Sequence, residues 1–189
     1  NQALETYRQM AQTYPNDALA HSGQARLLLQ HGQPQQALAA AETALKLNPH
    51  ELNAHTLQAS ALIRLNRFDE AKQKIEQALA QKLDGVGLRT ALFQLAFLQS
   101  NGDSLKQQID WARAQQLEDK ALDWQAQVAA ANGSLKQAVS DWRKAMDLNQ
   151  QLGRAELSAG YARAAGLRLA LSGQQTEALK LLDEADRLA

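Results

Sequence analysis

Four histidines are the side chains in this sequence best suited to bind a metal ion. His21 and His55 stand 34 residues apart, whereas His31 and His50 have no histidine four residues away. A zinc site needs three or four ligands about 2 Å from a common point, and side chains on successive helical hairpins lie about 10 Å apart. We therefore expect packing or surface roles for the histidines, and no metal site.

Other motifs that could support chemistry are incomplete. Gly85-Val86-Gly87 is similar to the start of a phosphate-binding loop, but Thr90 takes the place of the third glycine and no strand precedes it. The carboxylate pairs Asp69-Glu70 and Asp183-Glu184 are typical of a solvated helix surface. No serine or lysine stands beside a base that could activate it. We expect no catalytic residue, no cofactor and no enzymatic activity.

The composition favours helices and disfavours two kinds of partner. Of the 189 residues 45% are hydrophobic, mostly alanine and leucine, which enter helices at little cost. The 20 basic residues balance the 20 acidic ones, so the chain by itself lacks the positive field that attracts nucleic acid. No apolar run approaches the roughly 20 residues that span a membrane. The absence of cysteine leaves the compartment undetermined.

A repeat of 34 residues organises the sequence. Pro15 and Pro49 are separated by this interval, as are His21 and His55. The predicted turn residues of five successive hairpins are Gly32, Asn66, Gly102, Gly133 and Gly173, at spacings of 34, 36, 31 and 40. Each is followed twelve residues later by an alanine, small enough to let neighbouring helices approach closely: Ala44, Ala78, Ala114, Ala145 and Ala185.

These positions resemble the tetratricopeptide repeat family along nearly the whole chain. The resemblance implies an all-α solenoid of tandem helical hairpins, with about eleven helices in a right-handed superhelix. The predicted array covers 1–189, with a half unit over 1–17 and hairpins over 18–51, 52–87, 88–118, 119–152 and 153–189, the middle one irregular. The last two hairpins are also similar, more weakly, to the repeat tails of bacterial kinases or winged-helix regulators.

In the resembled family, set positions of the first helix of each unit face a concave groove that binds a partner. On this chain the charged residues at these positions are Arg26, Arg64, Arg89, Lys120 and Arg163 against Asp123 alone. Arginine binds carboxylates through paired hydrogen bonds, so the expected ligand is an acidic peptide or a free C-terminus. The predicted peptide-binding residues are Arg26, Gln30, Thr56, Arg64, Arg89, Lys120, Trp124, Gln127 and Arg163.

Two sets of residues allow more than one interpretation. Trp111 and Trp142 are expected in the core, whereas Trp124 either packs in the core or contacts the ligand. Glutamine recurs at an equivalent position of four units, as Gln24, Gln58, Gln94 and Gln125. These amides either bond to neighbouring helices and solvent or form a ladder that meets the backbone of a bound peptide.

The leading functional hypothesis is a protein-interaction module or scaffold that binds a partner segment in its groove. The alternative is a structural piece of a larger bacterial protein that self-associates, or packs on its neighbours, through uncapped terminal helices. This alternative is considered because the repeat pattern starts on a second helix and ends without a polar capping helix, which repeat arrays usually need.

Overall fold

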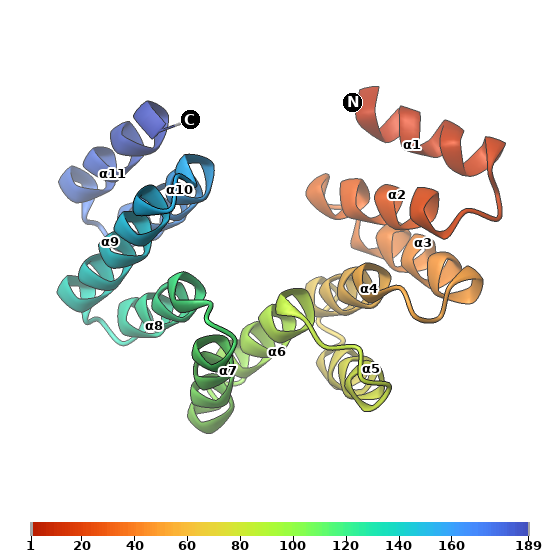
Figure 1. Cartoon of the computed structure of the whole chain (residues 1–189), viewed down its shortest axis with the longest axis horizontal. Helices are drawn as coiled ribbons and strands as arrows, with labels where there is room; N and C mark the ends of the chain where they lie inside the picture. Colours follow the sequence, from red (N-terminus) through yellow and green to blue (C-terminus); the bar gives the residue numbers. More distant parts are fainter. Residues whose placement is uncertain (1, 189) are drawn as a thin grey trace. The chain divides into compact units, whose positions relative to one another are not determined.

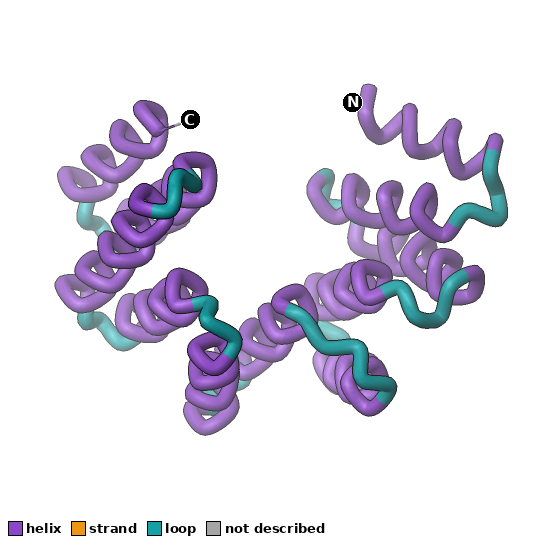
Figure 2. Tube along the Cα trace, in the orientation of Figure 1, coloured by secondary structure: helices purple, strands orange, loops and turns teal. Residues whose placement is uncertain are grey.

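The computed structural model describes residues 2–188, and in that range it contains eleven α-helices and no β-strand (Figures 1 and 2). Asn1 and Ala189, the outermost residues of the predicted array, lie outside the described residues. The helices are α1 (Gln2–Thr13), α2 (Ala18–Gln30), α3 (Pro34–Leu47), α4 (Leu52–Arg64), α5 (Phe68–Ala80), α6 (Val86–Leu98), α7 (Gly102–Ala114), α8 (Glu118–Ala131), α9 (Leu135–Gln151), α10 (Ala155–Leu171) and α11 (Gln175–Leu188). The prediction of an all-α solenoid of helical hairpins is confirmed.

The helices group into two compact units, Asn1–Ser104 and Leu105–Ala189. In the first unit α2–α3 and α4–α5 are hairpins, and the first helices α2, α4 and α6 pack side by side. In the second unit α8–α9 and α10–α11 are hairpins, and α9 packs against α10. α7 begins at the end of the first unit and has most of its length in the second. Each unit has its own core, in which alanine and leucine predominate.

The two helices of each hairpin are joined through one residue with a positive φ angle. These residues are Gly32, Asn66, Ser100, Gly133 and Gly173. In every case the backbone N–H of the following residue donates to the carbonyl five residues earlier, at 2.8–2.9 Å. This bond satisfies a carbonyl at the end of the first helix, which would otherwise lack a partner. The same local geometry therefore ends the first helix at all five turns.

The third turn corrects the predicted register. Its positive φ belongs to Ser100, whereas Gly102, the predicted turn residue, is the first residue of α7. Asn101 determines this start, because its side-chain oxygen accepts a hydrogen bond from the backbone N–H of Ser104 at 3.0 Å. The spacings of the turn residues are consequently 34, 34, 33 and 40. The prediction of a short step and an irregular turn at Gly102 is wrong.

The shift moves the alanine that allows close helix packing. Ala44, Ala78, Ala145 and Ala185 are fully buried, as predicted. In the third hairpin, however, the buried alanine is Ala112, and Ala114 is exposed. The alanine pattern therefore continues through all five hairpins once the third is read from Ser100.

The connections between successive hairpins are of two kinds. In the first two, the Nε2 atoms of His21 and His55 lie 3.0 and 2.8 Å from the carbonyl oxygens of Pro15 and Pro49. Each histidine thus ties the connection to the helix that follows it. The later connections instead turn through residues with positive φ, namely Lys82, Gln116 and Gly153.

The long last spacing arises from two long helices. α9 and α10 have 17 residues each, whereas the other helices have 12–14. Each therefore gains about one helical turn. The added turns carry buried polar groups: Ser158 is fully buried and donates to the carbonyl of Met146 at 3.2 Å.

The corrected register can be tested with two alanines of α7. Ala112→Leu should overpack the core and lower the free energy of unfolding by about 1–3 kcal/mol. Ala114→Leu, on the exposed side of the same helix, should change it by less than about 0.5 kcal/mol. Chemical denaturation of both variants measures the difference. A larger loss of stability for Ala114→Leu than for Ala112→Leu would instead support the register in which Gly102 is the turn residue.

Candidate functional site

The surface formed by α2, α4 and α6 is here called the first-helix face of the first unit. Arg26 and Gln30 are exposed on α2, one turn apart. The guanidinium of Arg26 donates through Nη2 to Oδ1 of Asn53, at the start of α4, at 3.1 Å. This contact joins two successive repeats and holds the arginine side chain across the face.

Arg64 makes the complementary contact from the other end of α4. Its Nη1 donates to the backbone carbonyl of Leu29 at 2.6 Å, next to Gln30. The helix macrodipole concentrates negative charge on the carbonyls in the last turn of α2, so a cation there is favoured. Arg26 and Arg64 are therefore both held on the α2–α4 surface by neutral oxygen atoms.

Thr56 is half-buried beneath α6. Its hydroxyl donates to the carbonyl of Leu52 at 3.0 Å. α6 passes directly over it, since a Cβ atom at Gly87 would lie 2.6 Å from the hydroxyl oxygen of Thr56. Glycine at this position lets α6 approach α4 closely, and Thr56 belongs mainly to that contact.

Arg89 is neutralised by an acid close in sequence. Its Nε and Nη2 donate to the two carboxylate oxygens of Asp84 at 2.8 and 2.7 Å, and its side chain is only 18% exposed. In the corrected register, Gly87 takes the groove position that was assigned to Arg89. Arg89 is thus a poor candidate for binding an acidic partner.

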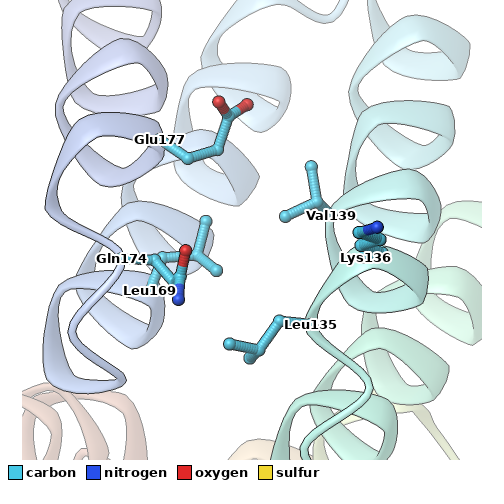
Figure 3. A pocket seen from close by; sticks show the side chains of 6 residues that line it. All are labelled: Leu135, Lys136, Val139, Leu169, Gln174 and Glu177. Atoms are coloured by element: carbon cyan, nitrogen blue, oxygen red, sulfur yellow. The ribbon is translucent and has the colours of Figure 1, made fainter.

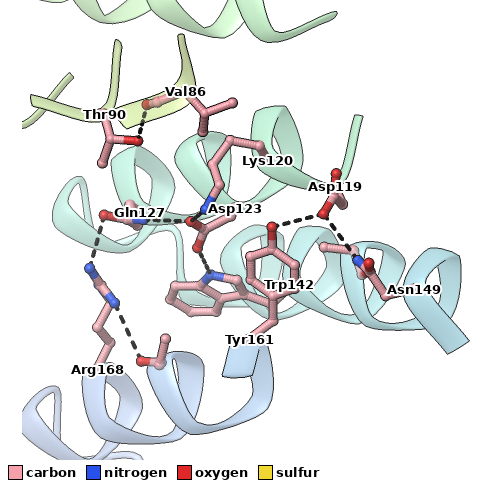
Figure 4. Close-up of polar contacts among 12 residues, drawn as sticks. Val86, Thr90, Asp119, Lys120, Asp123, Gln127, Trp142, Asn149, Tyr161 and Arg168 are labelled. Atoms are coloured by element: carbon pink, nitrogen blue, oxygen red, sulfur yellow. Dashed lines mark hydrogen bonds and ion pairs between the residues drawn. The ribbon is translucent and has the colours of Figure 1, made fainter. Parts of the chain in front are cut away.

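The first-helix face of the second unit is formed by α8 and α10 and is built around a buried carboxylate (Figure 4). Asp123 accepts from the indole N–H of Trp142 at 3.1 Å, and from the amide of Gln127 at 3.0 Å. Lys120 is paired with the same carboxylate at 3.4 Å. Gln127 in turn accepts from Nη2 of Arg168 on α10 at 2.9 Å. A chain of hydrogen bonds therefore links α9, α8 and α10.

A second buried network holds the other end of this face. The hydroxyl of Tyr161 donates to Asp119 at 3.0 Å, and the amide of Asn149 donates to the same carboxylate oxygen at 3.2 Å (Figure 4). Burial of Tyr161, together with the charge of Asp119, raises the pKa of its hydroxyl. The ammonium of Lys120 lies 5.1 Å from the centre of the Tyr161 ring, a favourable cation–π arrangement.

Between α8 and α10 these two networks surround a cavity of about 360 Å³. Its walls are Lys120, Asp123, Gln127, Leu157, Gly160, Tyr161, Ala164 and Arg168. Of the predicted binding residues, Lys120 and Gln127 meet in this cavity. Arg163 is exposed on α10 and is not part of its lining.

Another cavity of the second unit lies between α9 and the α10–α11 hairpin (Figure 3). It has a volume of about 340 Å³, and its apolar walls are Leu135, Val139 and Leu169. The carboxylate of Glu177 stands at its edge and accepts from Arg143 at 2.8 Å, which lowers the pKa of Glu177. The carboxylate of Glu177 is therefore already engaged.

The structure bears on the two sets of residues that the sequence left open. Trp124 is 1% exposed, so its assignment to the peptide-binding set is corrected to a core role. The four glutamines differ in burial: Gln58 is buried, Gln94 is exposed, and Gln24 and Gln125 are half-buried. The corrected register also removes Gln94 from the equivalent position, which Leu92 occupies.

Among residues 2–188, no group of three or more histidine, aspartate or glutamate side chains is arranged to hold a metal ion. Within the same range, no helix combines the length and apolar character that a membrane span requires.

The sequence did not identify Tyr161, Arg168 or Asp119 as members of a site. Arg168 and Gln127 are 41 residues apart, seven more than the repeat length, because α9 and α10 are lengthened. A regular 34-residue register therefore pairs the wrong residues here. The unusual spacing before Gly173 was the available indication that the last two hairpins differ from the others.

Comparison with known proteins agrees with this architecture. Residues 22–85 match the family model described as tetratricopeptide repeat. No curated protein matches the sequence. YrrB, a tetratricopeptide repeat protein with an unusual peptide-binding site, is 21% identical over 98% of this chain and 93% of its own, with a TM-score of 0.52.

Two further solved structures have the same fold. A tetratricopeptide repeat protein from Parabacteroides merdae ATCC 43184 is 16% identical over 97% of this chain and 77% of its own, with a TM-score of 0.66. BtubC from P. vanneervenii is 17% identical over 99% and 87%, with a TM-score of 0.56. Residues 22–85 thus match the tetratricopeptide repeat family, and the chain along nearly its whole length has the fold of these solved repeat proteins. This supports a role in protein interaction or scaffolding.

The Tyr161 network predicts a loss of stability in alkali. The folded-state pKa of Tyr161 lies above the unfolded value of about 10. The contribution of the Tyr161 hydroxyl to the free energy of unfolding is therefore complete below pH 10 and declines as the pH rises toward the folded-state pKa. Tyr161→Phe should lower the free energy of unfolding at neutral pH by about 0.5–1.5 kcal/mol and should reduce this decline. Denaturation at a series of pH values, with Tyr14→Phe as an exposed control, measures both effects; equal declines in both variants would contradict the assignment.

Proposed function

We propose that the chain is a protein-interaction module whose first-helix face in the first unit binds an extended segment that carries carboxylates. The proposal rests on one observation, the way in which Arg26 and Arg64 are held. Each contacts a neutral oxygen, of Asn53 or of the Leu29 carbonyl. A guanidinium has five N–H donors, so most donors on both arginines remain available.

The charges around these arginines support an acidic partner. Among the described residues, no aspartate or glutamate forms an ion pair with Arg26 or Arg64. Gln30, which is exposed one turn after Arg26 on α2, adds an amide that can bond to a peptide backbone. Because both arginines are fixed before a partner arrives, binding loses less side-chain entropy. YrrB, which has the same fold, has a peptide-binding site, and this agrees with a peptide as the ligand.

Two labelled peptides of equal length test the acidic preference, one with six consecutive glutamates and one with six glutamines. Fluorescence anisotropy at low salt should give a dissociation constant about tenfold lower for the glutamate peptide, and added salt should reduce the difference. In Arg26→Gln/Arg64→Gln the difference should disappear, because the two uncompensated charges are gone.

The matched control removes the same net charge from another surface. Arg67→Gln/Lys72→Gln affects residues of the α4–α5 turn and of α5, both in exposed ion pairs that contribute little to stability. The control should keep the preference for the glutamate peptide. An equal loss in both double variants, or equal binding of the two peptides by the unmodified chain, would contradict the proposal.

Self-association is a second candidate function, favoured by exposed leucines on the last hairpin. Leu171 is 82% exposed, and Leu167 and Leu179 are each 61% exposed. Exposed apolar side chains that lie near one another often mark an interface. Light scattering over a range of concentrations should detect association that is lost in Leu167→Ser/Leu171→Ser. A monomer at every concentration would exclude this function for the chain.

A further inference from the structure

Gly160 lacks the close packing found at Gly87 and Gly166, which also lie within helices. A Cβ atom at Gly166 would lie 2.8 Å from Leu182, so close helix packing requires glycine there. At Gly160, in the interior of α10, a Cβ atom would meet nothing within 4 Å. Glycine is among the least favourable residues inside a helix, and no neighbouring atom accounts for it at this position.

The open space beside Gly160 belongs to the cavity between α8 and α10. The volume of about 360 Å³ is within the range of small-ligand sites. Leu157, which is 51% exposed, and Ala164 supply an apolar wall on the α10 side. Any side chain larger than hydrogen at position 160 would project into this space.

The cavity also contains one uncompensated positive charge, that of Arg168, which lies on α10 like the apolar wall and reaches toward Gln127 on α8. Both oxygens of Asp123 already accept hydrogen bonds, and its charge is balanced by Lys120. Arg168 contacts only neutral oxygens, those of Gln127 at 2.9 Å and the Ala164 carbonyl at 3.5 Å. Among the described residues no acid pairs with it. The cavity therefore combines an apolar wall with a fixed guanidinium whose remaining donors have no partner.

We propose that this cavity is a separate recognition pocket for a peptide carboxylate next to an aliphatic side chain. Arg168 binds the carboxylate, as arginine does through paired hydrogen bonds. Leu157 and Ala164 contact the aliphatic group, and Gly160 leaves the room that this group occupies. The pocket lies within the second unit and does not depend on Arg26 or Arg64.

Small probes test the pocket directly. N-acetyl-leucine and N-acetyl-leucinamide have the same shape and differ in the charge of one end. In NMR titrations of the ¹⁵N-labelled chain, N-acetyl-leucine should shift the backbone amides of residues 157–168, with a dissociation constant in the millimolar range. N-acetyl-leucinamide should bind at least about tenfold more weakly. N-acetyl-glutamyl-leucinamide carries the carboxylate on a side chain, and its relative affinity distinguishes an internal acid from a C-terminus.

Gly160→Leu should abolish the shifts by filling the pocket, while the helix becomes no less stable because leucine favours helices. Gly102→Leu is the control: it also replaces a helical glycine with open space beside it, but outside the pocket, and it should bind like the unmodified chain. Arg168→Gln keeps a donor for Gln127 and should lose the preference for the acid over the amide.

Three results would overturn the proposal: equal binding of acid and amide, shifts confined to residues outside the pocket, or undiminished binding by a folded Gly160→Leu chain. The outcome is separable from that of the proposed function, because Arg26→Gln/Arg64→Gln should bind N-acetyl-leucine with unchanged affinity.

Discussion

The structure depends on reversing the chain after each helix without leaving the helix end unpaired. One residue with positive φ, followed by an N–H that bonds five residues back, does this at every hairpin. Because the turn fixes which residues of the two helices face each other, it also determines where a buried side chain must be small. The fully buried alanine twelve residues after each turn, from Ala44 to Ala185, follows from this geometry. A change of one residue at the turn would move every later contact in its hairpin.

Lengthening two helices changes what the second unit can contain. The extra turns of α9 and α10 place Asn149 and Ser158 in a fully buried position, where amide and hydroxyl groups must find partners. Asp119 and the carbonyl of Met146 accept from them. In the same unit, Arg168 on α10 donates to Gln127 on α8, and a cavity lies between these two helices.

The fold could be predicted because the same hairpin pattern recurs five times in the sequence. The candidate sites depend instead on contacts that each occur only once. Alanine spacing, turn residues and the balance of charge were enough for the solenoid. The predicted register of the third hairpin was wrong because Gly102 was taken as the residue with positive φ. In the structure this residue is Ser100, and Asn101 caps the following helix. Arg64 donates to a backbone carbonyl, that of Leu29. Because every residue has such a carbonyl, no residue type in the sequence indicates this contact. The burial of Trp124 depends on how neighbouring helices cover it, which residue type does not specify.

Counting basic residues by repeat position overstates the charge of the groove, and the reason is geometric. Arg89 and Lys120 have acids five and three residues away, Asp84 and Asp123, and these local partners cancel their charges. Arg26, Arg64 and Arg168 reach instead to a neighbouring first helix and end on an amide or a carbonyl. A neutral acceptor fixes the guanidinium but leaves its charge intact. Among these five cations, ion pairs with acids close in sequence therefore cancel the charge of Arg89 and Lys120, whereas the neutral acceptors of Arg26, Arg64 and Arg168 leave their charges uncompensated.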